Sequence, residues 1–295
     1  FLGIRVALVG EEEEEEEEII PNGKKLYLST EGNNNNDGLT PATAKATFAK
    51  AVAAALDGDT IIVADGLYSE AYEIKFEKLG VVVMAAEGAK PVVQLTGQWT
   101  SIVLMATTTF DGITFDGAGI AYYLLSSKGT DAGTFTFKNC EFTNWDSYWA
   151  ISNQYSDNTH VKSVVVDNCI FHDATGAAIH FNENGPRGAH ACDNLTITNS
   201  TFYNLSVVEW VGIIQLDGNS GAKQPNNLTL DHITMYNYKT SELGGIVSDV
   251  KTNLTLTNSI IANPANVTQR YGYAYGTSTI DHNLLFNVTK DSGTH

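Results

Sequence analysis

Short segments of alternating apolar and polar residues recur along most of the chain. Each copy runs apolar, polar, apolar, polar, continues with Asn or His, and places another apolar residue three positions after that Asn or His. A period of two is typical of β-strands, because successive side chains of a strand point to opposite faces of the sheet. Asn tolerates the left-handed backbone conformation that a sharp bend needs. The pattern therefore predicts pairs of strands joined by bends at Asn139, Asn168, Asn199, His232, Asn258 and His282.

The copies repeat at intervals of 29, 31, 33, 26 and 24 residues. No helical period of 3.6 residues separates them, which excludes the helical solenoids, and the uneven spacing fits a β-propeller poorly. A parallel β-helix accepts such variation, because loops absorb the length changes while the strands stay in register. Stacked Asn side chains can then bond to one another between coils. We expect an all-β solenoid whose continuous interior stack contains Phe142, Phe171, Phe202, Met235, Ile261 and Leu285.

The N-terminal side carries signals for a helix that closes the solenoid. Thr40 is a good N-cap, and Pro41 suits the first helical position. The following residues are rich in Ala, and Gly58 stands where the helix would stop. We therefore predict a capping helix at about residues 41–56, followed by strands at residues 60–66 and 81–84. A helix over the first coil would hide strand edges and core that are otherwise exposed.

Four N-terminal segments carry a family resemblance: residues 26–32, 37–45, 57–63 and 65–68. Their sequences are LYLSTEG, DGLTPATAK, DGDTIIV and DGLY. Together they resemble the opening of secreted right-handed β-helix proteins of the pectate-lyase-like superfold, nearest to chondroitinase-B-like and related uncharacterised bacterial surface proteins. The resemblance implies a right-handed parallel β-helix and an extracellular or cell-surface location. It implies an activity only weakly, because function lies in sites grafted onto a fold.

Charge separates the N-terminal segment from the rest. The chain has 17 Lys and Arg against 34 Asp and Glu, a net charge of −17, and residues 11–18 supply eight of the acids. Such a protein lacks the cations that bind nucleic acid, and no apolar run is long enough for a membrane span. We expect residues 1–20 to be a strand on an acidic tether and residues 21–295 to be a single β-helix domain. In that strand the apolar positions are Leu2, Ile4, Val6 and Leu8.

The basic residues do not predict a catalytic site. Polysaccharide lyases of this superfold resemble one another in using a Lys or Arg base, with Ca²⁺ or cationic groups that neutralise a substrate carboxylate. We find neither their basic motif nor the paired Asp residues of the hydrolases on the same fold, so we carry over no catalytic residue and lean against an enzyme. The basic candidates lie on different coils, where solvated surface charge is the favoured interpretation: Lys128, Lys162, Arg187, Lys223, Lys239 and Lys251.

The strongest candidate for a ligand site is a strand that runs into a Gly- and Pro-containing loop at residues 178–190. Equivalent strands align Asn182, Asp217 and Asp249 in nearly one outward column. Oxygen ligands in a column can hold Ca²⁺, and exposed aromatic rings can stack on sugars. The competing interpretation is that Asn and Asp populate turns while the aromatic residues cover the core. The candidate ligand residues are His180, Asn182, Glu183, Arg187, Asp217, Asp249, Trp149 and Trp210.

Two further features leave alternatives open. Cys140 and Cys169 hold equivalent places in adjacent copies, so they are either a disulfide or two stacked buried thiols. One outward column consists of threonines, which could order water but are also common strand residues. Its members are Thr136, Thr196, Thr229, Thr255 and Thr279.

Two functions from different classes follow from these patterns. The leading hypothesis is an extracellular structural β-helix that self-associates as a homo-oligomer or filament, through the N-terminal strand and an uncapped C-terminal end. The alternative is a carbohydrate-active protein, either a polysaccharide lyase or a sugar-binding module, with Ca²⁺ as a conceivable cofactor. A third interpretation is one domain of a longer protein.

Overall fold

The computed structural model describes residues 23–153, 158–183, 185–186, 188–207, 211–240, 244–248, 251–262, 264, 272–274 and 277–288. The predicted N-terminal strand (Leu2, Ile4, Val6 and Leu8) and the acidic tether lie outside these residues. The same holds for Arg187, Trp210 and Asp249 of the candidate ligand site.

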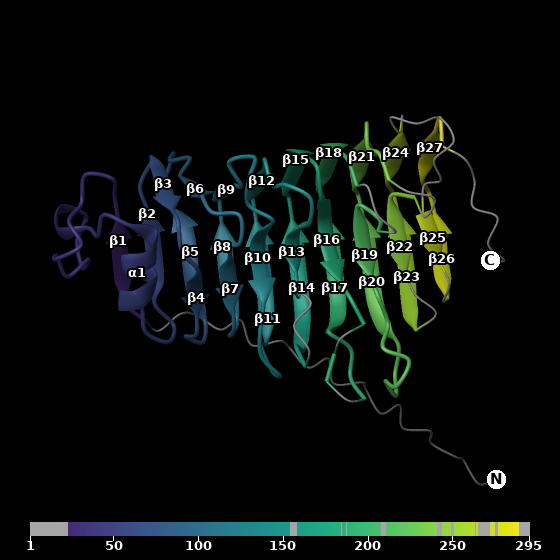
Figure 1. Cartoon of the computed structure of the whole chain (residues 1–295), viewed down its shortest axis with the longest axis horizontal. Coiled ribbons are helices and arrows are strands. Elements are labelled where there is room, and N and C mark those ends of the chain that lie inside the picture. The colour runs from purple at the N-terminus through teal and green to yellow at the C-terminus, as the bar shows by residue number, and fades with distance from the viewer. Residues whose placement is uncertain are drawn as a thin grey trace, which may run out of the picture.

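The described strands form three parallel sheets, and each complete coil contributes one strand to each sheet (Figure 1). Sheet A contains β1 (Lys25–Leu28), β2 (Thr60–Val63), β5 (Val81–Ala85), β8 (Thr108–Asp111), β11 (Thr134–Lys138), β14 (Val161–Asp167), β17 (Cys192–Thr198), β20 (Asn226–Asp231), β23 (Thr252–Thr257) and β26 (Ser278–Asp281). Sheet B contains β3 (Leu67–Glu70), β6 (Val92–Leu95), β9 (Thr114–Asp116), β12 (Glu141–Thr143), β15 (Ile170–Ala174), β18 (Thr201–Leu205), β21 (Thr234–Tyr236), β24 (Ile260–Ala262) and β27 (Leu284–Phe286). Sheet C contains β4 (Ile74–Phe76), β7 (Ile102–Leu104), β10 (Tyr123–Ser127), β13 (Trp149–Ser152), β16 (Ala177–Phe181), β19 (Ile214–Leu216), β22 (Ile246–Ser248) and β25 (Gly272–Ala274).

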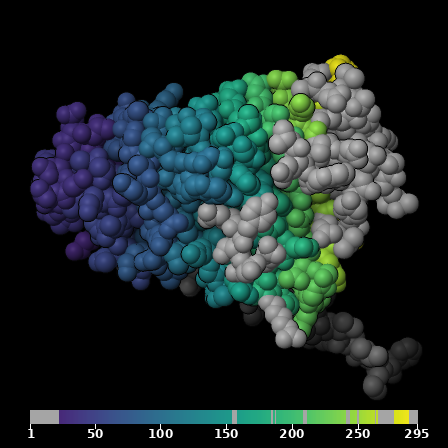
Figure 2. All heavy atoms as spheres, in the orientation of Figure 1, coloured from purple at the N-terminus to yellow at the C-terminus, as the bar shows by residue number. Residues whose placement is uncertain are grey.

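This arrangement confirms the predicted parallel β-helix. Coils of increasing residue number follow one another along the long axis of the molecule (Figure 2). Inside, the rings of Phe142 and Phe171 stack with centroids 4.3 Å apart, and Phe171 and Phe202 follow at 4.9 Å. Met235 and Ile261 continue the predicted stack and are fully buried. Leu285, in the last described coil, packs against the core but is only partly buried.

The bends between sheets A and B lie where the repeat predicts them. All six predicted Asn and His positions have a left-handed φ between 51° and 54°. The predicted Asn ladder forms only in part: Asn168 Nδ2 donates to Asn139 Oδ1 at 2.7 Å. Asn199 Nδ2 instead donates to Asp167 Oδ1 at 2.8 Å, because the carboxylate of the preceding coil is a stronger acceptor within the same reach.

The N-terminal helix is shorter than predicted. A 3₁₀ turn at Pro41–Thr43 is capped by Thr40, and α1 covers only Phe48–Ala54. The chain between them cannot be helical, because Lys45 forms a parallel bridge with Leu28 of β1. α1 still closes the first coil: it packs against β1, β3 and β4, and Phe48 is fully buried (Figure 1).

The stacking answers the open question of the cysteines and shows the register of the threonine column. Cys140 and Cys169 are free, buried thiols in adjacent coils, and the backbone N–H of Cys140 donates to Cys169 Sγ at 3.4 Å. Burial raises the pKa of Cys140 well above its ordinary value. The threonine column is real and lies on the outer face of sheet A, where its register is Thr136, Val165, Thr196, Thr229, Thr255 and Thr279.

Candidate functional site

The outer face of sheet C differs from that of sheet A because its polar side chains are buried. Lys75 in β4 is exposed, whereas its neighbours Ile74 and Phe76 are buried. The residues that pair in register with Lys75 on the following strands of sheet C therefore form the outward-facing column. Further along this column every residue is at most 7% exposed. The column from Lys75 onward consists of Val103, Ser126, Ser152, His180, Gln215 and Val247.

His180 of this column forms a pair with Asp217, which directly follows β19 of the next coil. Nε2 of His180 lies 3.0 Å from Oδ2 of Asp217, and Gln215 Nε2 donates to both carboxylate oxygens at 2.9 and 3.1 Å. Gln215 is itself held, because its Oε1 accepts from the backbone N–H of Gly212 at 2.9 Å. We call His180, Gln215 and Asp217 the buried triad.

The second nitrogen of His180 is the unusual atom of the triad. Nδ1 is buried and has no hydrogen-bond partner among the described residues. Because a carboxylate only accepts, Nε2 carries the hydrogen, and Nδ1 of the neutral ring presents a lone pair. Leaving a buried acceptor unpaired costs about 1–3 kcal/mol, so this atom is a place where a ligand hydroxyl would be stabilised.

An aromatic platform leads to the triad along the solenoid. It consists of Trp99, Tyr122 and Tyr148, which stand immediately or shortly before strands β7, β10 and β13. Trp99 is 61% exposed, and its ring centroid lies 4.8 Å from that of Tyr122. Tyr122 and Tyr148 are also 4.8 Å apart. Three successive coils therefore contribute one partly or fully exposed ring each to a single cluster.

Trp149 connects the platform to the triad. Its ring packs edge-on against Tyr148 with centroids 5.7 Å apart, and edge-on against His180 at 4.7 Å. Trp149 is only 3% exposed, so its ring packs against the imidazole and forms no part of the exposed platform.

A polar groove of about 450 Å³ lies beyond the triad. Its walls are the loops that follow β16 and β19. His180 lies in β16, and Asp217 directly follows β19. Amide side chains line its floor, where Asn227 Nδ2 donates to Asn194 Oδ1 at 2.9 Å. Lys223 also lines the groove and forms no ion pair with a described residue.

The two histidines of the groove are already engaged. His160 Nε2 lies 3.0 Å from Asp193 Oδ2. His190 uses both ring nitrogens on the backbone: Nε2 lies 2.7 Å from the carbonyl oxygen of Gln224, and Nδ1 accepts from the N–H of Asn219 at 2.9 Å. Both ring nitrogens of His190 are therefore occupied by the backbone, whereas His160 is held through Nε2 alone.

The structure brings together three of the residues named from the sequence: Trp149, His180 and Asp217. Asn182 lies nearby and is 7% exposed, and its Oδ1 accepts from Nδ2 of buried Asn153 at 2.6 Å. The expected outward column of Asn182, Asp217 and Asp249 stays a prediction, because Asp249 lies outside the described residues. Glu183 is exposed in the loop after β16.

The Ca²⁺ site expected from the aligned oxygens is tested only in part, because Asp249 lies outside the described residues. Both oxygens of Asp217 already accept hydrogen bonds from Gln215. No group of three or more His, Cys, Asp or Glu in the described ranges could hold a metal ion. Ca²⁺ prefers six to eight oxygen ligands, which these side chains do not assemble.

Sequence reasoning missed Trp99, Tyr122 and Gln215. The first two belong to early coils in which the Asn-marked pattern is degenerate, so their alignment with Tyr148 was not visible. A usable signal was the aromatic residue that recurs just before the apolar strand in three consecutive coils. Gln215 had no signal, because only the register of β16 and β19 places it beside His180.

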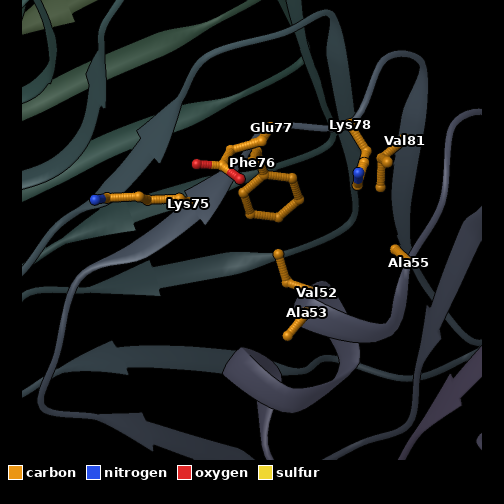
Figure 3. Close-up of a pocket in the computed structure, with 8 residues that line it drawn as sticks. All are labelled: Val52, Ala53, Ala55, Lys75, Phe76, Glu77, Lys78 and Val81. Carbon is orange, nitrogen blue, oxygen red and sulfur yellow. The ribbon is translucent and has the colours of Figure 1, made fainter.

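A second cavity lies at the opposite end of the molecule. It has a volume of about 90 Å³ and lies between α1 and β4, with Val52 and Phe76 among its walls and Lys75, Glu77 and Lys78 at its rim (Figure 3). Its volume admits only a few atoms, so we do not regard it as the functional site.

Comparison with known proteins identifies the fold. No protein-family model and no curated protein sequence matches the chain. Among solved structures, the chain is similar to AlyGC, an alginate lyase of family PL6, with 17% identity and a TM-score of 0.56 over 90% of this chain and 40% of AlyGC. A variant of AlyGC gives 13% identity and a TM-score of 0.57 over the same shares of the two chains.

A third solved structure, pectate lyase Pel9A, matches with 14% identity and a TM-score of 0.35, over 88% of this chain and 78% of that one. Compared with AlyGC, the chain spans only 40% of that protein's length. Likeness at these identities establishes architecture alone. Together with the three parallel sheets described above, the likeness to AlyGC shows that the chain has a parallel β-helix fold.

Proposed function

We propose that this chain is a carbohydrate-active β-helix that binds an extended polysaccharide along the outer edge of sheet C. The observation that carries the proposal is the aromatic platform, in which Trp99, Tyr122 and Tyr148 of three consecutive coils form one cluster with an exposed end. The flat C–H faces of pyranose rings stack on such rings, and successive sugars of a polymer can engage successive coils.

The triad and the groove extend the binding track beyond the platform. A sugar hydroxyl that donates to His180 Nδ1 would satisfy the buried lone pair, and Asp217 and Gln215 hold the imidazole in the orientation that this requires. Further along, the amide-lined groove offers donors and acceptors at the coil spacing. Lys223 and Lys251 precede the adjacent strands β20 and β23, and Lys162 lies in β14; none of the three forms an ion pair with a described residue, which favours an acidic polymer.

The test is a binding measurement with alginate, pectate and a glycosaminoglycan, each with and without Ca²⁺. Trp99→Ala should weaken binding roughly 10-fold, the loss of about 1.4 kcal/mol expected for one stacked ring. Tyr72→Ala is the matched control, because Tyr72 is 84% exposed and lies outside the platform. Ultraviolet absorbance of unsaturated products, followed in the same samples, reports whether the bound polymer is cleaved.

Equal affinities of the wild type and Trp99→Ala for every polymer would refute the platform as the binding surface. Cleavage that is lost in His180→Gln, with binding retained, would add a lyase activity to the proposal. An extracellular or cell-surface location is part of the same proposal, because extended polysaccharides of this kind are met outside the cell.

A second candidate function is self-association. In the described part of the chain, β25, β26 and β27 are the last strands of their sheets and pair on one side only. Unpaired edges of this kind accept further strands. Deleting residues 1–20 should then abolish assembly seen by light scattering or electron microscopy. A monomeric full-length protein, or assembly unchanged by the deletion, would exclude this role.

A further inference from the structure

The outer face of sheet B becomes uncharged toward the C-terminal end. In β18, β21, β24 and β27 the outward positions carry only uncharged residues, which are Thr, Tyr, Asn, Ile, Ala, Leu and Phe. The same coils of sheet A carry Asp231 and Asp281 on their outer face. In a chain with a net charge of −17, an uncharged face of this length is a distinct surface. Its exposed members include Tyr236, Ile260, Leu284 and Phe286.

Aromatic rings on this face form a ladder. His172 stacks on Tyr203 with centroids 4.9 Å apart and planes 5° from parallel, and Tyr203 stacks on Tyr236 at 5.3 Å and 7°. The ladder begins from a fixed ring, because both nitrogens of His172 are bonded to carboxylates, Asp173 at 2.7 Å and Glu141 at 2.8 Å. Each ring holds the next one in orientation.

The ladder lacks one ring. The residue in register with Tyr236 in the next coil is Ala262, and the coil after that places Phe286 in the same column. Tyr236 is 38% exposed and Phe286 is 53% exposed. Since neighbouring strands lie about 4.8 Å apart, the backbones at Tyr236 and Phe286 are separated by about 9.6 Å. A flat ring above Ala262 would sit at the spacing that the existing rings already have.

We propose that this space, the Ala262 slot, is a second carbohydrate site that takes one neutral pyranose ring. Tyr236 forms one wall of the slot and Phe286 lies on the other side, while Ile260 and Leu284 form an apolar border. Asn237 follows Tyr236 directly and donates from Nδ2 to Asn204 Oδ1, so its own Oδ1 is the atom that can accept from a sugar hydroxyl. No cation lies among the outward residues of these strands, so an acidic sugar would gain no ion pair there.

The size of the face argues against a second copy of the chain as its occupant. Four coils at about 4.8 Å each, with two outward residues per strand, cover roughly 200 Å². Stable protein interfaces bury about 800 Å² on each partner. An area this small suits a few sugar units. The inference is independent of the site proposed on sheet C, because a different sheet and different residues carry it.

Ala262→Phe is the decisive variant, because it inserts the missing ring. It should complete the ladder and keep or raise the melting temperature, while weakening the binding of cellohexaose, a neutral oligosaccharide, at least roughly 10-fold. Tyr236→Ala should weaken binding similarly. Thr255→Phe adds the same ring to the outer face of sheet A and serves as the matched control with unchanged affinity.

Titration of cellohexaose by calorimetry, with Trp99→Ala measured in parallel, separates the two sites. Loss of affinity in Ala262→Phe but not in Trp99→Ala supports the slot. Three outcomes would overturn it: no cellohexaose binding at millimolar concentration, an affinity unaffected by Ala262→Phe, or an affinity lost only in Trp99→Ala. A wild-type dimer in sedimentation that Ala262→Phe dissociates would also overturn it, by making the face a protein contact.

Discussion

Asp231 illustrates how one carboxylate joins two coils of the solenoid. Its Oδ1 accepts from Thr257 Oγ1 at 2.7 Å and from Asn258 Nδ2 at 2.8 Å, both on the next coil, while His232 Nδ1 lies 2.7 Å from Oδ2. These hydrogen bonds favour the ionised form and lower the pKa of Asp231 to about 2. Asp167 is bonded in the same way to Thr198 and Asn199, which lowers its pKa as well.

The depressed pKa of Asp231 predicts an acid-sensitive contribution to stability. Because the folded-state pKa lies below the unfolded value of about 3.9, the contribution is complete above that value and is lost as the pH falls toward 2. The carboxylate is partly exposed, so screening limits the effect to less than about 1 kcal/mol. Urea unfolding at neutral pH should show Asp231→Asn to be less stable than the wild type by this small amount, with the difference vanishing near pH 2.

Asp131→Asn is the control for this measurement, because Asp131 is exposed and makes no hydrogen bond to a described side chain. It should leave the unfolding curve unchanged at both pH values. An Asp231→Asn difference that is the same at neutral pH and near pH 2 would show that the carboxylate charge is not the source.

At the scale of elements, α1 and the first coil depend on one another. α1 has only seven residues, too few for a stable isolated helix. It is held by its buried face, where Phe48 is 0% exposed and its ring lies 6.1 Å from that of Phe76 in β4. The helix in turn covers the core of the first coil, which would otherwise be open to water.

Phe48→Ala should therefore destabilise the protein by about 3–5 kcal/mol, the usual cost of removing a buried Phe side chain. Lys50→Ala, at an exposed position of the same helix, should change stability by less than about 0.5 kcal/mol. Denaturant unfolding measures both. A small effect of Phe48→Ala would mean that the first coil is stable without its cap.

At the scale of the whole molecule, the three sheets give the solenoid three different outer faces. Sheet A presents the threonine column and hydrogen-bonded carboxylates, and sheet B presents an apolar and aromatic face at its C-terminal end. Sheet C has a buried polar column and carries the aromatic platform just before β7, β10 and β13. No helix in the described part of the chain has the length and apolarity of a membrane span. The faces differ in charge, so their proposed ligands should differ in their response to salt.

Raising NaCl from about 0.05 M to about 0.5 M should weaken the binding of an acidic polysaccharide, since screening shortens the reach of the unpaired lysines. Lys223→Ala should lower that affinity at low salt and reduce its salt dependence. Cellohexaose binding at the Ala262 slot should not respond to either change. Salt-independent binding of pectate or alginate would contradict the role of the lysines.

The alternating pattern by itself determined the architecture of this protein. Asn and His residues that tolerate a left-handed φ mark the bends, and apolar residues at a fixed offset mark the interior, so Asn139 and Phe142 identify one coil from sequence alone. The helix expected from local sequence is interrupted where the chain pairs with a distant strand. Residues 44–47 continue a helix-forming stretch, but Lys45 pairs with β1 and ends it.

The candidate site was decided mainly by tertiary structure. Trp149, His180 and Asp217 could be named in advance, because they stand beside recognisable strands and turns. Their grouping with Trp99, Tyr122 and Gln215 depends on how coils of unequal length stack, since the loops absorb different numbers of residues before the strands return to register. The residue period of a coil can be identified from the sequence. Which side chains of adjacent coils meet depends on strand register, and that register is set by packing across the whole solenoid.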